Sequence, residues 1–295
     1  MFELFFEIGN YAIWVFVVTS IAAMGLNLTV PEVLAPWKKK WLLSISLIAN
    51  FVIVPLFALF ILYLFPLDPE LATGLILVAA AAGAPSLPKA MELVRGNVAY
   101  AVGLTMILIL VTIFYMPFML PYLVEGANVD QTSTALYLIV FMLIPLIITM
   151  TIRAKFPLLA YRLYPVVDRV SDLSIIVVLL IYTVALFLSD FSVKAGTLLG
   201  LEGTAVAILF ILGSFAIGYA LGGPELQNRH VLAFGTGFRN VSAALVVVSA
   251  SFTEPQTLFM VLVIAIFGII FMFIIGGWLY RKNRKEGQRN PARDL

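Results

Sequence analysis

Two polar interruptions in an otherwise apolar chain carry the residue types that can do chemistry. The first is GAPSLPKAMELVRGN, residues 83–97, and the second is AFGTGFRNVSAAL, residues 233–245. Broken helices offer backbone N–H groups, and a guanidinium matches a carboxylate, sulfonate or phosphate with two parallel hydrogen bonds. The chemistry predicted is therefore the binding of an anion. The residues that we expect to bind it include Ser86, Lys89, Thr236, Gly237, Arg239 and Asn240.

The composition places these interruptions in a membrane. Hydrophobic residues make up 62% of the 295 residues and charged residues 12%, and the mean hydropathy is +1.08. These values are typical of a polytopic membrane protein. The absence of Cys excludes thiolate metal sites and cysteine nucleophiles, and a single His excludes a histidine metal cluster. We expect no metal site and no cofactor, with the role of sodium left open.

Apolar windows of roughly 20 residues, long enough to cross a bilayer, recur along the chain. They predict about nine spans. The first is expected to be a retained helix, because the N-terminus lacks the basic region of a signal peptide. The windows fall near 10–29, 41–65, 70–94, 98–121, 133–153, 170–189, 203–222, 229–251 and 256–280.

The distribution of basic residues orients the nine spans. Fifteen of the 18 Lys and Arg residues fall on one side and Lys194 alone on the other, leaving Lys89 and Arg239. Basic residues accumulate in cytoplasmic connections. The sequence therefore predicts a prokaryotic inner-membrane protein with its N-terminus outside and its C-terminus in the cytoplasm. The basic connector at 153–169 is predicted to lie at the cytoplasmic interface, where lipid phosphates would meet its charges.

The third and eighth spans are antiparallel in this topology, and both are interrupted near the middle. Matching interruptions in two halves indicate an inverted-repeat transporter, whose binding site lies where two discontinuous helices cross. Simple proline kinks are the alternative. We expect an all-α integral membrane fold forming one domain, 1–295. Its parts are a first repeat at about 10–121, a second at about 133–280 and a cytoplasmic tail at 281–295.

The two cations near the interruptions differ in depth. Arg239 follows Arg229 by ten residues, which places it about 15 Å further along a helix and near the middle of the membrane. A lone intramembrane Arg is costly, so it needs a carboxylate partner or a wet cavity. Glu92 and Asp172 are the acids in reach. Lys89 either approaches Arg239 at the crossing or extends its side chain to the cytoplasmic interface.

The same segments resemble the bile acid:sodium symporter family. The resemblance is carried by AAMGLNLTV, LIANFVIVPLFAL, ELATGLILVAAAAGAPSLPKAMELVRGNVAYAVGLT and the Gly-x-Gly-x-x-Asn pattern of the eighth span. It implies a core domain with two crossing discontinuous helices beside a panel domain, in the form with nine spans. It also implies that Asn50 and Thr105 occupy positions at which the family has polar site residues.

The departures from the family bear on what drives transport. The resemblance implies Ser and Asn at the positions that Leu87 and Pro88 occupy here, as in sodium-coupled members. It likewise implies Glu and Gln at the positions of Gly235 and Arg239. Both sodium sites of the family are thereby in question. Our hypothesis is that Arg239 replaces bound sodium as a fixed charge, which cannot couple transport to a sodium gradient. The candidates for coupling to another ion are Asn50, Glu92 and His230.

We therefore expect a transporter of a small organic anion, either a carboxylate or a bile-acid-like compound, that works by alternating access and is not sodium-coupled. A sodium-dependent symporter with altered ligands and a non-transporting sensor remain alternatives. We do not expect an enzyme, because an intramembrane enzyme would need a serine dyad, an acidic pair or a metal motif and the sequence shows none. We do not expect a channel, because a channel would need polar residues along several helices, whereas polarity here is concentrated at the two interruptions. The expected partners are the substrate and the lipid bilayer, without nucleic acid or an obligatory protein partner.

Overall fold

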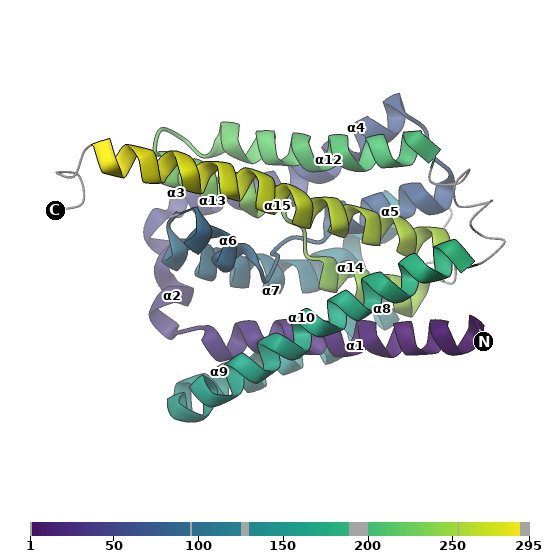
Figure 1. The fold of residues 1–295 in the computed structure, drawn as a ribbon, viewed down its shortest axis with the longest axis horizontal. Helices are drawn as coiled ribbons and strands as arrows, with labels where there is room; N and C mark the ends of the chain where they lie inside the picture. Colours follow the sequence, from purple (N-terminus) through teal and green to yellow (C-terminus); the bar gives the residue numbers. More distant parts are fainter. Residues whose placement is uncertain (1, 95, 125–129, 189–199, 253, 290–295) are drawn as a thin grey trace.

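A computed structural model describes the chain except at residues 1, 95, 125–129, 189–199, 253 and 290–295. All regular secondary structure in the described part is helical, and most of the helices run roughly parallel to one axis (Figure 1). This confirms the all-α membrane fold class. The start of α1 and the end of α15 lie at opposite ends of the molecule, as an odd number of crossings requires.

The first half of the chain forms three continuous crossings and one divided crossing. Its helices are α1 (Phe2–Asn27), α2 (Val30–Leu34), α3 (Lys40–Ile48), α4 (Val54–Leu64), α5 (Pro69–Ala80), α6 (Leu87–Leu93) and α7 (Val98–Leu123). A 3-10 turn at Ala35–Lys39 leads into α3, and a π-helical turn at Ala49–Ile53 joins α3 to α4.

The second half repeats this pattern with one further crossing at its start. Its helices are α8 (Gln131–Leu138), α9 (Ile144–Lys155), α10 (Pro157–Leu188), α12 (Gly200–Leu221), α13 (Leu226–Gly237), α14 (Val241–Ser251) and α15 (Pro255–Arg289). Another π-helical turn, at Ile139–Leu143, joins α8 to α9.

Seven helical segments among the described residues are long and apolar enough to cross a membrane. The two predicted spans that are missing from this set have structural explanations. The span near 70–94 is divided into α5 and α6, and the span near 170–189 belongs to α10, whose side chains are described only as far as Val184. The predicted interfacial connector at 153–169 is different in the structure, because residues from Pro157 onward continue into α10 as one helix.

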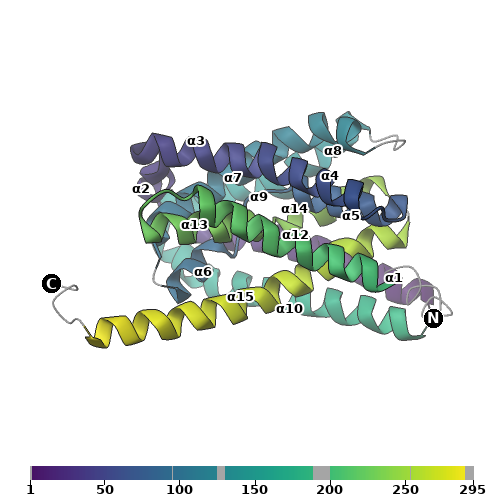
Figure 2. The same ribbon diagram turned by 90° about the horizontal axis from the view of Figure 1, so that it is seen from above.

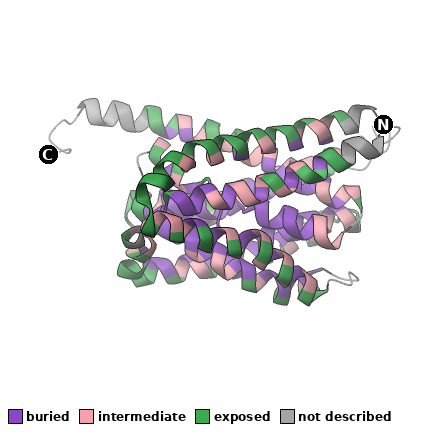
Figure 3. Cartoon of the chain, turned by 90° about the horizontal axis from the view of Figure 1, so that it is seen from below, coloured by how far each residue is buried: buried purple, intermediate pink, exposed green. Residues whose placement is uncertain are grey.

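Buried residues gather in the interior of the bundle (Figure 3). In the α13–α14 segment 94% of the most apolar window is buried, against 22% in the α8–α9 segment. Helices α1, α9 and α10 pack against one another, and we call them the panel. We call α3–α7 and α12–α15, which surround the divided helices, the core. The view from above in Figure 2 shows α12 and α13 next to each other, with α10 and α15 on one face of the bundle.

Candidate functional site

The two divided helices meet through their backbones. Helix α5 ends at Ala80 and α13 ends at Gly237, and neither is followed by a direct helical continuation. The backbone N–H of Asn240, in the second break, donates to the carbonyl oxygen of Ala81, in the first, at 2.9 Å. Antiparallel divided helices that touch at their breaks form the crossing that the sequence predicted.

Helix α7 packs against the first break and forms hydrogen bonds with its backbone. Gly83 adopts φ 85°, and a Cβ there would lie 2.7 Å from the backbone nitrogen of Ile109, so a side chain is excluded on both conformational and steric grounds. The hydroxyl of Thr112 accepts from the N–H of Ala82 and donates to its carbonyl oxygen, each at 3.0 Å. These bonds satisfy backbone groups that could not face lipid unpaired.

A proline explains why additional carbonyls point into the same region. Pro55 has no N–H, so a carbonyl four or five residues before it cannot find its usual helical donor. The π-helical turn before α4 leaves two such oxygens, those of Asn50 and Phe51. The hydroxyl of Tyr115 donates to Phe51 O at 2.8 Å, and Arg239 donates to Asn50 O at 3.4 Å.

Arg239 fills a cage of oxygen atoms at the crossing. Its Nη1 donates to Asn50 Oδ1 at 2.7 Å, its Nη2 to Ala79 O at 2.6 Å, and its Nε to Val78 O at 3.2 Å. The side chain is only 4% exposed. A guanidinium has five N–H groups, so one N–H of Nη1 has no acceptor among the described residues.

The charge of Arg239 is balanced by dipoles rather than by an acid. Among the described residues it forms no ion pair; neither Glu92 nor Asp172, the partners expected from the sequence, bonds to it. Two of its acceptors, Val78 O and Ala79 O, belong to the last turn of α5, where the helix dipole places partial negative charge. The guanidinium thus occupies the position of a bound cation while remaining tethered to the chain.

The N-terminus of α14 lies beside this cage. Asn240 caps it, with Oδ1 accepting from the N–H of Ala243 at 3.0 Å, whereas its Nδ2 is buried without a partner in the described part of the chain. The hydroxyls of Ser242 and Ser20 are 2.9 Å apart and link α14 to α1 of the panel. A helix N-terminus, an unused amide donor and a guanidinium together favour a negatively charged group.

A cavity of about 780 Å³ opens beside the α14 N-terminus, between panel and core. Its apolar wall is formed by α15, where Gly268 has nothing within 4 Å of the position that a Cβ would take. Its polar wall is formed by α6 and α10. The charged residues that line it are Glu32, Lys89, Glu92, Arg153, Asp168, Asp172 and Arg239.

One ion pair joins α6 to α10 within the polar wall of the cavity. Lys89 Nζ, on α6, lies 2.7 Å from Asp168 Oδ1, on α10, with side-chain exposures of 47% and 24%. Asp172 lies within electrostatic range of Lys89 on the next turn of α10. Lys89 therefore meets the panel rather than forming a hydrogen bond with Arg239.

The structure brings together five of the residues that we expected from the sequence. Ser86, Lys89, Glu92, Gly237 and Arg239 all line the cavity, and Asn240 lies between the lining residues Arg239 and Val241.

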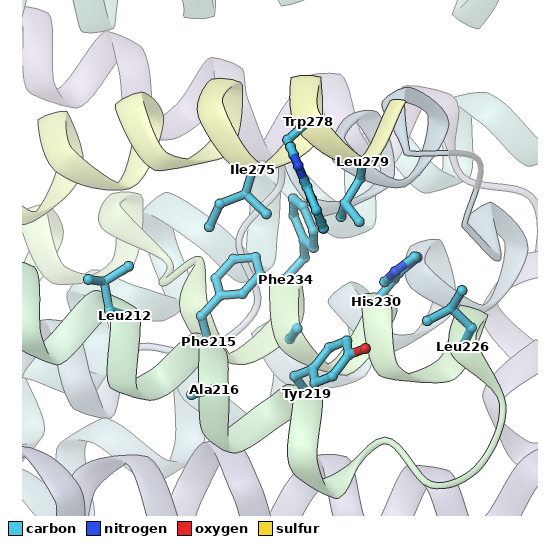
Figure 4. Close-up of a pocket in the computed structure, with 11 residues that line it drawn as sticks. Leu212, Phe215, Ala216, Tyr219, Leu226, His230, Phe234, Ile275, Trp278 and Leu279 are labelled. Carbon is cyan, nitrogen blue, oxygen red and sulfur yellow. The ribbon is translucent and has the colours of Figure 1, made fainter. Parts of the chain in front are cut away.

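Four other candidates lie elsewhere. Thr105 donates to Ala101 O within α7, and Thr236 donates to Ser214 O, toward α12. Asn50 is fully buried and binds Arg239. His230 lines a separate, largely apolar groove of about 410 Å³ between α12, α13 and α15, together with Tyr219 and Trp278 (Figure 4). The roles in substrate binding or ion coupling that the sequence suggested for these four residues remain predictions.

Several polar residues of the cavity were missed in the sequence. Glu32, Asp168 and Tyr164 lay in segments expected to be connectors, and Ser20 and Ser242 are single hydroxyls in apolar helices. One available signal was the spacing of Asp168 and Asp172, because residues four apart share a helix face. Two acids on one face of an apolar helix indicate a polar environment.

The chain is similar to known transporters over much of its length. The model of the Sodium Bile acid symporter family matches residues 13–195. A protein of Oryza sativa subsp. japonica, described as the probable sodium/metabolite cotransporter BASS2, chloroplastic, is 28% identical over 153 residues. That match covers 51% of this chain and only 36% of the relative. The family match ends before α12, so the second break and Arg239 lie outside it.

Proposed function

We propose that the chain, which belongs to the Sodium Bile acid symporter family, carries a small organic anion across the membrane by alternating access. The single observation that supports the anion is the buried N-terminus of α14 at the wall of the cavity. Oriented N–H groups there attract a carboxylate, sulfonate or phosphate without a further cation. Arg239, which also lines the cavity, adds positive charge beside them.

Movement of the panel against the core would expose this site to each side in turn. Among the described residues, two polar side-chain contacts join the bodies across the cavity: the hydroxyls of Ser20 and Ser242, and the ion pair of Lys89 with Asp168. Each contact is of modest strength, since one is between neutral hydroxyls and the other is partly exposed. A rocking motion can therefore break both at low cost, as alternating access around a fixed site requires.

We further propose that sodium does not drive this transport. A sodium ion needs several oxygen ligands, and the oxygens of Val78, Ala79 and Asn50 already accept from Arg239. A cation that is part of the chain is present in every conformation and cannot dissipate an ion gradient. Only a mobile ion that binds one conformation better than another transmits such energy.

Sodium coupling remains the competing proposal, because the rice relative is described as a probable sodium/metabolite cotransporter. A sodium site in this chain would have to lie outside the cage that Arg239 fills. The two proposals differ in one observable: sodium-coupled binding makes substrate affinity depend on sodium, whereas the tethered cation makes it independent of sodium.

We also propose that the N-terminus faces outward and the C-terminus faces the cytoplasm. Helices α2, α6 and α9 and the end of α15 gather at one end of the molecule (Figure 1). Lys38–Lys40 and Arg153 belong to that end, which supports its assignment to the cytoplasmic side.

Ligand binding to the purified protein in detergent tests the proposed function. Small carboxylates, sulfonates, phosphates and steroid acids are added in NaCl and in KCl, and the thermal unfolding midpoint is followed. We expect at least one anion class to raise the midpoint equally in both salts. A midpoint that no anion raises would contradict the anion site, and stabilisation in NaCl alone would support sodium coupling.

A further inference from the structure

The cavity has two ends of opposite electrostatic character. The inner end holds Arg239 and the N-terminus of α14, whose Asn240 Nδ2 has no partner in the described part of the chain. The outer end, by which we mean the end farther from the crossing, lies between α6 and α10 and is rich in carboxylates. A ligand that fills the cavity from one end to the other meets both environments.

Among the described residues that line the outer end, acids outnumber cations. Lys89 is already compensated by Asp168. The carboxylates of Glu92 and Asp172 form no hydrogen bond or ion pair with any described residue, although both residues line the cavity. Arg153 is the remaining cation of the lining away from Arg239. The lining also includes Glu32, whose carboxylate accepts from the hydroxyl and N–H of Thr29.

An aromatic ring completes the outer end. Tyr164 lines the cavity one turn before Asp168 and lies within electrostatic range of Lys89, Glu92 and Asp172. Unpaired carboxylates beside the face of a Tyr ring are the groups that bind alkylammonium ions in proteins. The same carboxylates repel a ligand whose only charge is negative.

We propose that the transported acid also carries an ammonium group, so that the substrate class is a zwitterionic amino acid or amino sulfonic acid. Its acid group binds at the α14 N-terminus beside Arg239, and its ammonium group binds between Glu92 and Asp172. This inference rests on the proposed function, because it assigns the second half of a ligand whose acid half that function already places. The cavity of about 780 Å³ accommodates both charged ends and an apolar linker against α15.

Matched ligand pairs test the ammonium directly. β-Alanine, 4-aminobutyrate, 6-aminohexanoate and taurine are compared with propionate, butyrate, hexanoate and ethanesulfonate by calorimetry in KCl. We expect at least one amino acid to bind about 10-fold more tightly than its amine-free partner, since one additional charge-assisted bond contributes about 1.4 kcal/mol. The chain length of the amino acid that binds most tightly indicates the distance between the sites of its acid group and its ammonium group.

Variants test whether the preference for amino acids over amine-free acids arises at the outer end. Glu92→Gln and Asp172→Asn should each weaken the amino acid about 10-fold and leave the amine-free partner unchanged or tighter. Glu202→Gln, an exposed carboxylate of α12 outside the cavity, is the matched control and should change neither affinity. Because Glu92 and Asp172 are exposed and their carboxylates have no partner in the described part of the chain, both variants are expected to fold.

The outcomes separate the two proposals. Equal or tighter binding of the amine-free acids by the unmodified protein overturns the zwitterion while retaining the anion carrier. A preference for amino acids that survives in both variants overturns the assignment to Glu92 and Asp172. Failure of both ligand classes to bind contradicts the proposed function itself.

Discussion

Replacing Arg239 by Gln probes the tethered cation most sharply. The substitution removes the donors that satisfy Val78 O, Ala79 O and both oxygens of Asn50. Hydrogen bonds from charged donors contribute about 1.5–3 kcal/mol each, and the several kcal/mol needed to bury a guanidinium offsets part of that. Since Gln can replace two donors at most, we expect the free energy of unfolding to fall by about 2–4 kcal/mol.

The vacated cage should then respond to sodium. Four oxygens and the Gln carbonyl would face the space that the guanidinium leaves, and hard cations prefer oxygen ligands. If sodium binds the variant with a dissociation constant on the order of 10 mM, sodium at about 100 mM would raise the free energy of unfolding by about 1.4 kcal/mol. The unmodified protein should show no such gain, because its own cation occupies the cage.

Thermal unfolding in detergent, followed by tryptophan fluorescence in NaCl and in N-methylglucamine chloride, measures both effects. Arg229→Gln is the matched control: it removes a guanidinium of α13 whose Nε donates to Gly223 O at 2.6 Å, away from the crossing. It should show no response to sodium. The reasoning is refuted if the unmodified protein is stabilised by sodium as strongly as Arg239→Gln, or if that variant unfolds at an unchanged midpoint.

Three further predictions concern the cavity and the two bodies that enclose it. Gly268→Leu should fill the cavity without a clash and weaken binding of the longer acids more than the shorter ones. Calorimetry can check this against Gly277→Leu, which lies on the same helix with equally open space but outside the cavity. This control should leave the affinity for longer and for shorter acids unchanged. Because the chain contains no Cys, Ser20→Cys combined with Ser242→Cys gives a single pair whose oxidation should join panel to core and stop exchange of bound acid, with reduction restoring it. A cross-linked protein that still exchanges would contradict the rocking motion. Lys89→Met breaks a partly exposed ion pair, so the loss of unfolding free energy should stay below about 1 kcal/mol; a much larger loss in thermal unfolding would show that the contact is structural.

The sequence predicted the divided helices because their causes are local. Gly83 and Pro85 cannot continue α5, and the polar residues that follow Gly235 disturb an apolar helix. Hydropathy also located the crossings, although the length of α10 did not follow from it. Pro165 was expected to belong to a connector, and the structure accommodates it inside a continuous helix.

The partners of Arg239 were not predictable because three of the four oxygens that it binds are backbone atoms. A search of the sequence for acids leads to Glu92 and Asp172, whereas the oxygens come from the end of α5 and from a π-helical turn before Pro55. Both features arise from local chain geometry, but their convergence on one side chain depends on how distant helices pack. No residue pattern in the sequence records that convergence.

The direction of Thr236 illustrates the same limit. It lies three residues before Arg239, a spacing that puts two side chains on one face of a continuous helix. The helix ends between them at Gly237, so the geometry no longer holds. Thr236 faces α12, and Arg239 faces the crossing.

Uptake into proteoliposomes tests the central claim, an anion carrier whose cation is part of the chain. The purified protein is reconstituted, and entry of the tightest-binding radiolabelled acid is measured with an inward gradient of NaCl or of KCl at equal membrane potential. The account predicts uptake above that of empty liposomes at equal initial rates in the two salts. A several-fold faster rate with sodium would contradict it.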